Sequence, residues 1–170
     1  MQNVQLWKLG GFTMLNESFP LRLKKARNAH GFTQIEVAKE LLLNRVNLSR
    51  YETGAVEPDI ETIAQLADFY GVTTDWLIGR VEKTDKNPVS TWDRQQGHTE
   101  SFPDKLKKAR KKTGMSQEKV AKILKMSKSN IAKYELGQLQ PSLETLIRLT
   151  VFYGVTSDWL LGLTEDNPAF

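Results

Sequence analysis

The sequence predicts an all-α protein made of two tandem five-helix domains, and three observations support this fold class. The segment from Phe19 to Gly79 recurs without a gap from Phe102 to Gly162, with about half of the aligned positions identical. The apolar residues of each copy follow a helical period. Helix-capping residue types stand where helix ends are expected. We therefore predict domain 1 over residues 19–79 and domain 2 over residues 102–162.

The first two helices of each domain are predicted from their ends. Helix one spans Pro20 to Ala29, or Pro103 to Lys112, with proline in the first turn and a glycine soon after the last. Helix two follows Thr33-Gln-Ile-Glu36, which is a complete capping box, or Ser116-Gln-Glu-Lys119, which is not. Its inward-facing stripe consists of Val37, Ala38 and Leu41, matched by Val120, Ala121 and Leu124.

The last three helices follow in the same way. In domain 1, Asn44 caps a third helix that runs to Tyr51, Asp59 caps a fourth, and Thr74 opens a short fifth helix containing Trp76. The inner face of the fourth helix should be Ile60, Ile63, Leu66, Ala67 and Tyr70, matched by Leu143, Leu146, Leu149, Thr150 and Tyr153. The remaining domain 2 counterparts are Ser127, Tyr134, Ser142, Ser157 and Trp159. The tyrosines and tryptophans are expected in the cores.

Three segments lie outside the duplication. Residues 80–101 are polar and are predicted to form a flexible linker, whose random-coil span is roughly 25 Å. Residues 163–170 form a C-terminal tail. Residues 1–18 are either a disordered tail or contain a misannotated leader, because two glycine codons just before Met14 can encode a ribosome-binding site. We hypothesise that translation starts at Met14; native peptides from upstream of it in a mass spectrum would exclude this.

Composition excludes several classes of site. There is no cysteine, and the only histidines, His30 and His98, stand alone, so we expect no disulfide, no metal site and no catalytic residue. No phosphate-binding loop is visible either, and we expect no cofactor, no small-molecule substrate and no enzyme activity. The absence of a long apolar run or a signal peptide predicts a cytoplasmic protein without a membrane partner.

Charge differs between the two domains. Domain 1 has a formal charge of −1, whereas domain 2 has +7. This difference favours an acidic partner for domain 2, with nucleic acid as the leading candidate; the alternative is a solvated lysine-rich helix face. Helix one of domain 2 could add non-specific attraction to phosphates through Lys105, Lys107, Lys108, Arg110, Lys111 and Lys112.

Two short helices joined by a tight turn, the second with exposed polar residues, are typical of a helix-turn-helix. The segments Thr33–Leu41, Asn44–Gly54, Pro58–Ile63 and Gly71–Leu77 resemble the Xre family of phage-repressor-like (lambda repressor-like) DNA-binding domains, and domain 2 resembles it equally well. The resemblance covers about three quarters of the chain. It implies a five-helix fold whose third helix enters the major groove of double-stranded DNA.

The resemblance also implies which residues contact DNA. Base edges would be faced by Arg45, Val46, Ser49 and Arg50 in domain 1 and by Lys128, Ser129, Ala132 and Lys133 in domain 2. Phosphates would be held by Gln34, Asn44, Gln117 and Ser127, with Asn47 and Asn130 beside the backbone and suited to either task. Arginine forks suit guanine, whereas lysine is a less selective point charge.

One pair of residues departs from the family pattern. The family usually has glycine in the turn between helices two and three, where this chain has Leu42 and Lys125. The turn must therefore have another geometry or hold a side-chain-bearing residue at an unfavourable dihedral, at a cost of about 1 kcal/mol.

The leading functional hypothesis is a sequence-specific transcriptional regulator from a phage, mobile element or bacterium. It would repress by promoter occlusion, as a covalent pseudo-dimer on an asymmetric or imperfectly palindromic operator with half-sites about 34 Å apart. The alternative is that only domain 2 binds DNA. In that case domain 1, with its −1 charge and the apolar Val46 at a base-facing position, is a protein-interaction or dimerisation module for an antirepressor, a toxin or a second copy.

Overall fold

The computed structural model describes residues 18–82 and 100–165, which contain ten helices and no strand, as the sequence predicts. Domain 1 contains α1 (Phe19–Ala29), α2 (Gln34–Glu40), α3 (Arg45–Thr53), α4 (Ile60–Phe69) and α5 (Thr74–Leu77). Domain 2 contains α6 (Phe102–Lys112), α7 (Gln117–Leu124), α8 (Lys128–Glu135), α9 (Leu143–Tyr153) and α10 (Ser157–Leu160). The Met14 hypothesis and most of the linker and C-terminal tail lie outside the described residues.

The predicted helix starts are built from local hydrogen bonds. The Thr33 hydroxyl accepts from the Glu36 backbone N–H at 3.2 Å, and the Glu36 carboxylate accepts from the Thr33 N–H at 2.7 Å, which completes the capping box of α2. Ser116 caps α7 through its hydroxyl oxygen alone. The third residue is glutamate in α2 and lysine in α7. Only the glutamate can accept a hydrogen bond from the backbone N–H of the cap residue, so the two helix starts differ.

The turn between the second and third helices adopts the strained option. Leu42 has φ 54° and Lys125 has φ 51°, both in the left-handed region that favours glycine. Leu42 is 94% exposed, so packing does not hold it there. The helix-turn-helix geometry is thus kept at the expense of backbone strain, and the shape of the turn is conserved between the two domains.

The two apolar cores are closed at one end by residues from the other domain. Leu23, Leu48 and Leu66 are fully buried in the core of domain 1, and most of the predicted inner-face residues join them. Two residues were expected on the inner face of their own domain, and that expectation was wrong. Ile60 of α4 packs in the core of domain 2, and Leu143 of α9 packs against the core of domain 1. The exchange arises because α4 and α9 are the helices of each domain that face the other domain.

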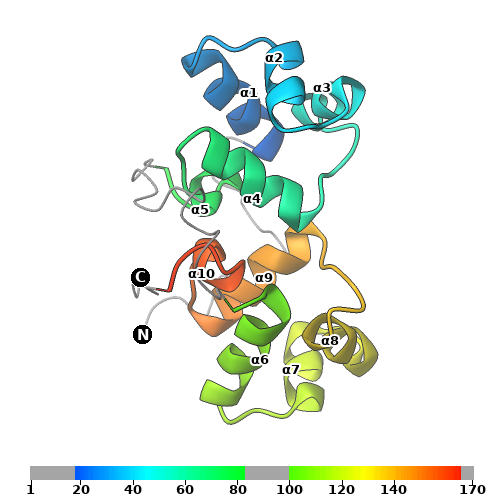
Figure 1. The fold of residues 1–170 in the computed structure, drawn as a ribbon. Coiled ribbons are helices and arrows are strands. Elements are labelled where there is room, and N and C mark those ends of the chain that lie inside the picture. The colour runs from blue at the N-terminus through cyan, green and yellow to red at the C-terminus, as the bar shows by residue number, and fades with distance from the viewer. Residues whose placement is uncertain (1–17, 83–99, 166–170) are drawn as a thin grey trace.

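Figure 1 shows the resulting arrangement. Helices α1–α3 lie at one end of the molecule and α6–α8 at the other, with α4, α5, α9 and α10 between them. The short helices α5 and α10 are in contact across the interface between the domains. Each residue of domain 1 corresponds to the residue 83 positions later. Equivalent helices therefore meet at the interface, and the two domains are arranged as in a symmetric dimer.

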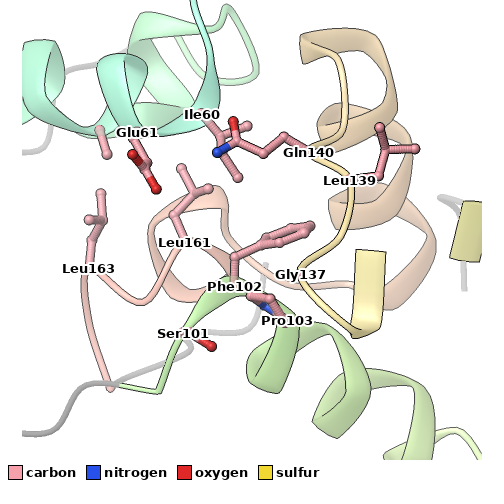
Figure 2. Close-up of a pocket in the computed structure, with 11 residues that line it drawn as sticks. Ile60, Glu61, Ser101, Phe102, Pro103, Gly137, Leu139, Gln140, Leu161 and Leu163 are labelled. Carbon is pink, nitrogen blue, oxygen red and sulfur yellow. The ribbon is translucent and has the colours of Figure 1, made fainter. Parts of the chain in front are cut away.

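The interface is packed unequally on its two sides. On one side Ile147 of α9 is buried within the core of domain 1. Its counterpart in α4 is Ala64, and beside Ala64 lies a cavity of about 320 Å³. Figure 2 shows this cavity between the domains, with Ile60 and Glu61 on one side and Phe102 and Leu161 on the other. The small Ala64 side chain thus leaves a space on one side of the interface, whereas Ile147 fills the equivalent space on the other side.

We expect Ala64→Ile to stabilise the docked arrangement by about 1–2 kcal/mol, because it adds three carbons where apolar space is open. The measurement is the urea midpoint of the full chain. Ile147→Ala is the matched control and should lower the midpoint by creating a second cavity. An unchanged or lower midpoint for Ala64→Ile would contradict the prediction.

Candidate nucleic-acid interface

The third helix of each domain presents its predicted base-facing residues to solvent. On α3, Arg45, Val46, Asn47 and Arg50 are exposed and Ser49 is half-buried. On α8, Lys128, Ser129 and Lys133 are exposed, whereas Asn130 and Ala132 are half-buried. The opposite faces are anchored by buried side chains, namely Leu48 and Tyr51 in α3 and Ile131 and Tyr134 in α8. The faces available to DNA are therefore set by helical periodicity.

The caps of these helices bind their own backbone. The Asn44 side-chain oxygen accepts from the Val46 N–H at 2.8 Å, and the Ser127 hydroxyl accepts from the Asn130 N–H at 3.0 Å. These bonds fix the first turn of α3 and α8, where side chains reach bases in helix-turn-helix complexes. The predicted phosphate contacts of Asn44 and Ser127 stay predictions.

A buried network holds α3 against the first two helices, and sequence reasoning missed it. Arg27 of α1 donates from Nε and Nη2 to the two carboxylate oxygens of Glu52 at 2.6 and 2.9 Å, and from Nη1 to the Phe32 carbonyl. Gln34 donates its side-chain amide to Glu52 at 2.9 Å. Gln34, predicted to anchor phosphate, is thus also a support for α3, because its amide fixes a residue of that helix.

Domain 2 repeats this network atom for atom. Arg110 donates to Glu135 at 2.5 and 2.9 Å, and Gln117 donates to the same carboxylate at 2.9 Å. The signal was present in the sequence, since all three residues are identical in both copies although none is apolar. What the sequence lacked was any indication that the three side chains meet.

The network shifts the pKa values of its members. Burial acts to raise the pKa of Glu52 and of Glu135, but hydrogen bonds from the arginine and the glutamine outweigh it and leave both pKa values below their ordinary range. The hydrogen bond to glutamate raises the pKa of Arg27 and of Arg110. Both pairs are therefore ionised at neutral pH, and the carboxylates do not oppose a phosphate backbone as free negative charges.

Two of the basic residues assigned to phosphate attraction on α6 are used internally, and that expectation was wrong for them. Lys105 is fully buried, donates to Glu165 at 2.8 Å and lies 5.0 Å from the centre of the Trp159 ring. Arg110 is held by Glu135. Lys108 is exposed but pairs with Glu100 at 2.6 Å. The long lysine side chain reaches a carboxylate beyond the core, which spacing along one helix does not reveal.

The two domains are joined through a reciprocal pair of carboxylates. Asp75 in α5 accepts from the Ser157 backbone N–H at 2.8 Å and from its hydroxyl at 2.9 Å. Its counterpart Asp158 in α10 accepts from the Thr74 N–H at 3.0 Å. Each aspartate thus binds the first residue of the last helix of the other domain, where unpaired N–H groups favour negative charge. Such an exchange is the pattern of a two-fold symmetric interface.

The environment of these carboxylates is not symmetric. Arg80 bonds to Asp75 and donates to the Val155 carbonyl of domain 2 at 3.3 Å. At the equivalent position domain 2 has Leu163. Burial, together with the charge of Asp75, outweighs the hydrogen bonds from Thr74 and raises the pKa of Asp158 to about 6. The first residue of the predicted linker is therefore part of the interface.

The helix-turn-helix family HTH_3 matches residues 23–77 and again residues 106–160. The chain belongs to this helix-turn-helix family. Both matches begin within the first helix and end within the fifth, so each covers one domain. The family assignment thus agrees with the two structural units and with the resemblance seen in the sequence.

Curated regulators resemble one domain-sized segment of this helix-turn-helix protein. ImmR, a transcriptional regulator of Bacillus subtilis, is 44% identical over 66 residues, or 39% of this chain and 52% of ImmR. The SPbeta prophage-derived YonR of the same species is 40% identical over 60 residues, covering 35% of this chain and 56% of YonR. The cryptic phage CTXphi repressor RstR of Vibrio cholerae is 35% identical over 66 residues, covering 39% and 60%.

The chain therefore spans little more than half the length of these relatives. No solved structure gives a significant match to it. Within residues 18–82 and 100–165, no three metal-ligating side chains gather as they would around an ion. None of the helices in those ranges has the length and apolar character needed to cross a bilayer.

Proposed function

We propose that this helix-turn-helix protein is a sequence-specific DNA-binding transcriptional regulator that acts as a covalent pseudo-dimer. One observation carries the proposal: two complete helix-turn-helix units are docked through the reciprocal bonds of Asp75 and Asp158. In Figure 1, α3 and α8 lie at the same edge of the molecule and at opposite ends. Family members that read DNA as dimers need two reading helices on one face, and a single chain supplies both here.

The chemistry of the two faces supports an asymmetric or imperfectly palindromic operator. Arg45 and Arg50 are exposed donors suited to guanine in one half-site. Lys128 and Lys133 occupy the same positions in domain 2 and supply charge with less selectivity. Because the two helices differ at base-facing positions, one half-site cannot be optimal for both.

Repression by occlusion is the mechanism we favour. RstR is described as a phage transcriptional repressor, and YonR as a prophage-derived regulator. A rigid pair of reading helices needs no further domain to cover a promoter. Action in the cytoplasm on nucleoid DNA follows from this role, and an antirepressor or a second copy of the chain would be the protein partner.

The second candidate function, a protein-docking role for domain 1, is favoured by one observation. Domain 1 exposes four large apolar side chains at positions that are charged or polar in domain 2: Leu21, Ile35, Leu42 and Val46. Apolar groups at the surface of a single domain can mark a protein contact. Selection of bound DNA by charge-reversed variants distinguishes this role from DNA reading.

The test is selection of bound DNA from a random library by the intact protein, with sequencing. It is run beside two charge-reversed variants, Arg45→Glu/Arg50→Glu and Lys128→Glu/Lys133→Glu. We expect a two-part motif that loses one half with each variant. A single motif lost only with the domain 2 variant would favour protein docking by domain 1. A library without enrichment would refute sequence-specific regulation.

A further inference from the structure

The reading face of domain 1 carries two exposed apolar side chains at positions that are polar or charged in domain 2. Val46, the second residue of α3, is 61% exposed, and Ile35, the second residue of α2, is 60% exposed. The equivalent residues of domain 2 are Ser129 and Glu118. The backbone around them is similar in both domains: the turn residues have nearly equal φ angles, and the same hydrogen-bond network holds the third helix. The difference therefore lies in side-chain chemistry at fixed positions.

Domain 2 shows how a side chain at the position equivalent to Ile35 extends relative to the reading helix. Glu118 of α7 is 3.9 Å from the ammonium group of Lys128, the first residue of α8. In domain 1 the corresponding residues are Ile35 and Arg45. By the repeat, Ile35 stands at a position of α2 from which a side chain can extend toward the first turn of α3, the turn that also carries Val46.

We propose that Val46 and Ile35 recognise thymine by packing against its C5-methyl group in the half-site read by domain 1. The inference rests on the proposed DNA-binding function and specifies its substrate. Thymine is the one DNA base with a methyl group in the major groove, and apolar side chains distinguish it there by contact. Removing exposed valine and isoleucine surface from water favours that contact.

The surroundings of the two residues favour DNA over a protein partner. Arg45 and Arg50 are exposed on the same helix as Val46. The carboxylate of that helix, Glu52, is buried and paired with Arg27 at 2.6 Å. An apolar group on a helix with two exposed arginines and no free carboxylate suits a surface that carries phosphates and methyl groups.

The proposal predicts unequal half-sites. The half-site of domain 1 should combine guanine, read by arginine, with at least one adjacent thymine. Domain 2 has Ser129 at the equivalent position, whose hydroxyl can donate or accept and so distinguishes bases poorly. Loss of a methyl group beside Val46 should therefore weaken binding in the domain 1 half-site, whereas the base-facing set of domain 2 contains one apolar residue, Ala132.

The experiment replaces thymine by deoxyuridine, one position at a time, in the operator recovered by library selection. This change removes only the methyl group. With the wild-type chain, we expect about a three- to fivefold loss of affinity for at least one substitution in the domain 1 half-site. Substitutions in the domain 2 half-site are the matched control: a methyl contact there would come from Ala132, so any change in affinity should be the same for the wild type and for variants of Val46 or Ile35.

Two variants with the residues of domain 2, Val46→Ser and Ile35→Glu, complete the design. Val46→Ser should bind thymine- and uracil-containing operators equally. Its circular dichroism and its binding to the domain 2 half-site should show that the variant is folded. A recovered operator without thymine in the domain 1 half-site would overturn the inference while leaving DNA binding intact. So would a methyl effect that persists in both variants, or a domain 1 that binds protein instead of DNA. Failure of the proposed function appears differently, as a library without any motif, and removes the inference with it.

Discussion

Arg110→Leu should lower the free energy of unfolding by about 3–5 kcal/mol, because it leaves the Glu135 carboxylate buried without its cation. The Glu135 side chain is only 3% exposed, and two of its hydrogen bonds come from Arg110. The same substitution removes the ion pair between α6 and α8, so the reading helix should also be held less firmly, although Ile131 and Tyr134 still pack in the core. Urea unfolding followed by circular dichroism measures the effect.

A double variant separates the lost charge pair from the lost packing. Arg110→Leu/Glu135→Gln carries no buried charge and keeps an acceptor for Gln117, so it should recover more than half of the loss. The pH dependence has a defined sign. The pKa of Glu135 lies below its ordinary value, so the pair contributes stability above pH 4.5 and loses it as pH falls through the folded-state pKa. A single-variant loss below about 1 kcal/mol at pH 7 would contradict the prediction.

The parts of the fold that could be predicted are those encoded locally. Helix starts follow from a residue and its neighbour three positions later, as Thr33 and Glu36 show. Core positions follow from periodicity, and Leu66 and Tyr70 are buried as expected. The strain at Leu42 was foreseen as one of two options, because a missing glycine constrains only its own backbone. Each of these inferences needed no knowledge of which elements pack together.

The parts that could not be predicted depend on which helices meet. Asp75 and Asp158 are identical in both copies, yet a repeated aspartate before Trp-Leu reads equally well as a surface residue of a short helix. The exchange of Ile60 and Leu143 between cores has the same origin, since periodicity gives a face without naming its partner. Lys105 appeared to belong to a basic surface and is instead fully buried. A single sequence gives little information on which polar groups, far apart in the chain, pair with one another.

Asp158→Asn and Asp75→Asn should change stability in opposite directions, although the two residues are equivalent by the repeat. Asp158 has a raised pKa of about 6, so its ionised form is disfavoured in the folded protein. Stability from this group is fully present below its ordinary pKa of 3.8 and is lost as pH rises through 6. At pH 7.5, asparagine removes that penalty and keeps an acceptor for the Thr74 N–H, which should stabilise the chain by about 1–3 kcal/mol.

Asp75→Asn should instead destabilise by about 2–5 kcal/mol, because Arg80 loses its ionic partner at a largely buried interface. Thermal unfolding at pH 7.5 and at pH 5 gives both signs, and the gain from Asp158→Asn should shrink at the lower pH, where the wild-type carboxyl is largely protonated. Arg80→Leu is the matched control: it gives Asp75 the aliphatic neighbour that domain 2 has in Leu163, so stability should fall. Equal effects of the two asparagine variants would mean that Arg80 does not distinguish the carboxylates. The docking of the domains would then rest on apolar packing of α4 and α9 rather than on the asymmetric pairing of one aspartate with one arginine.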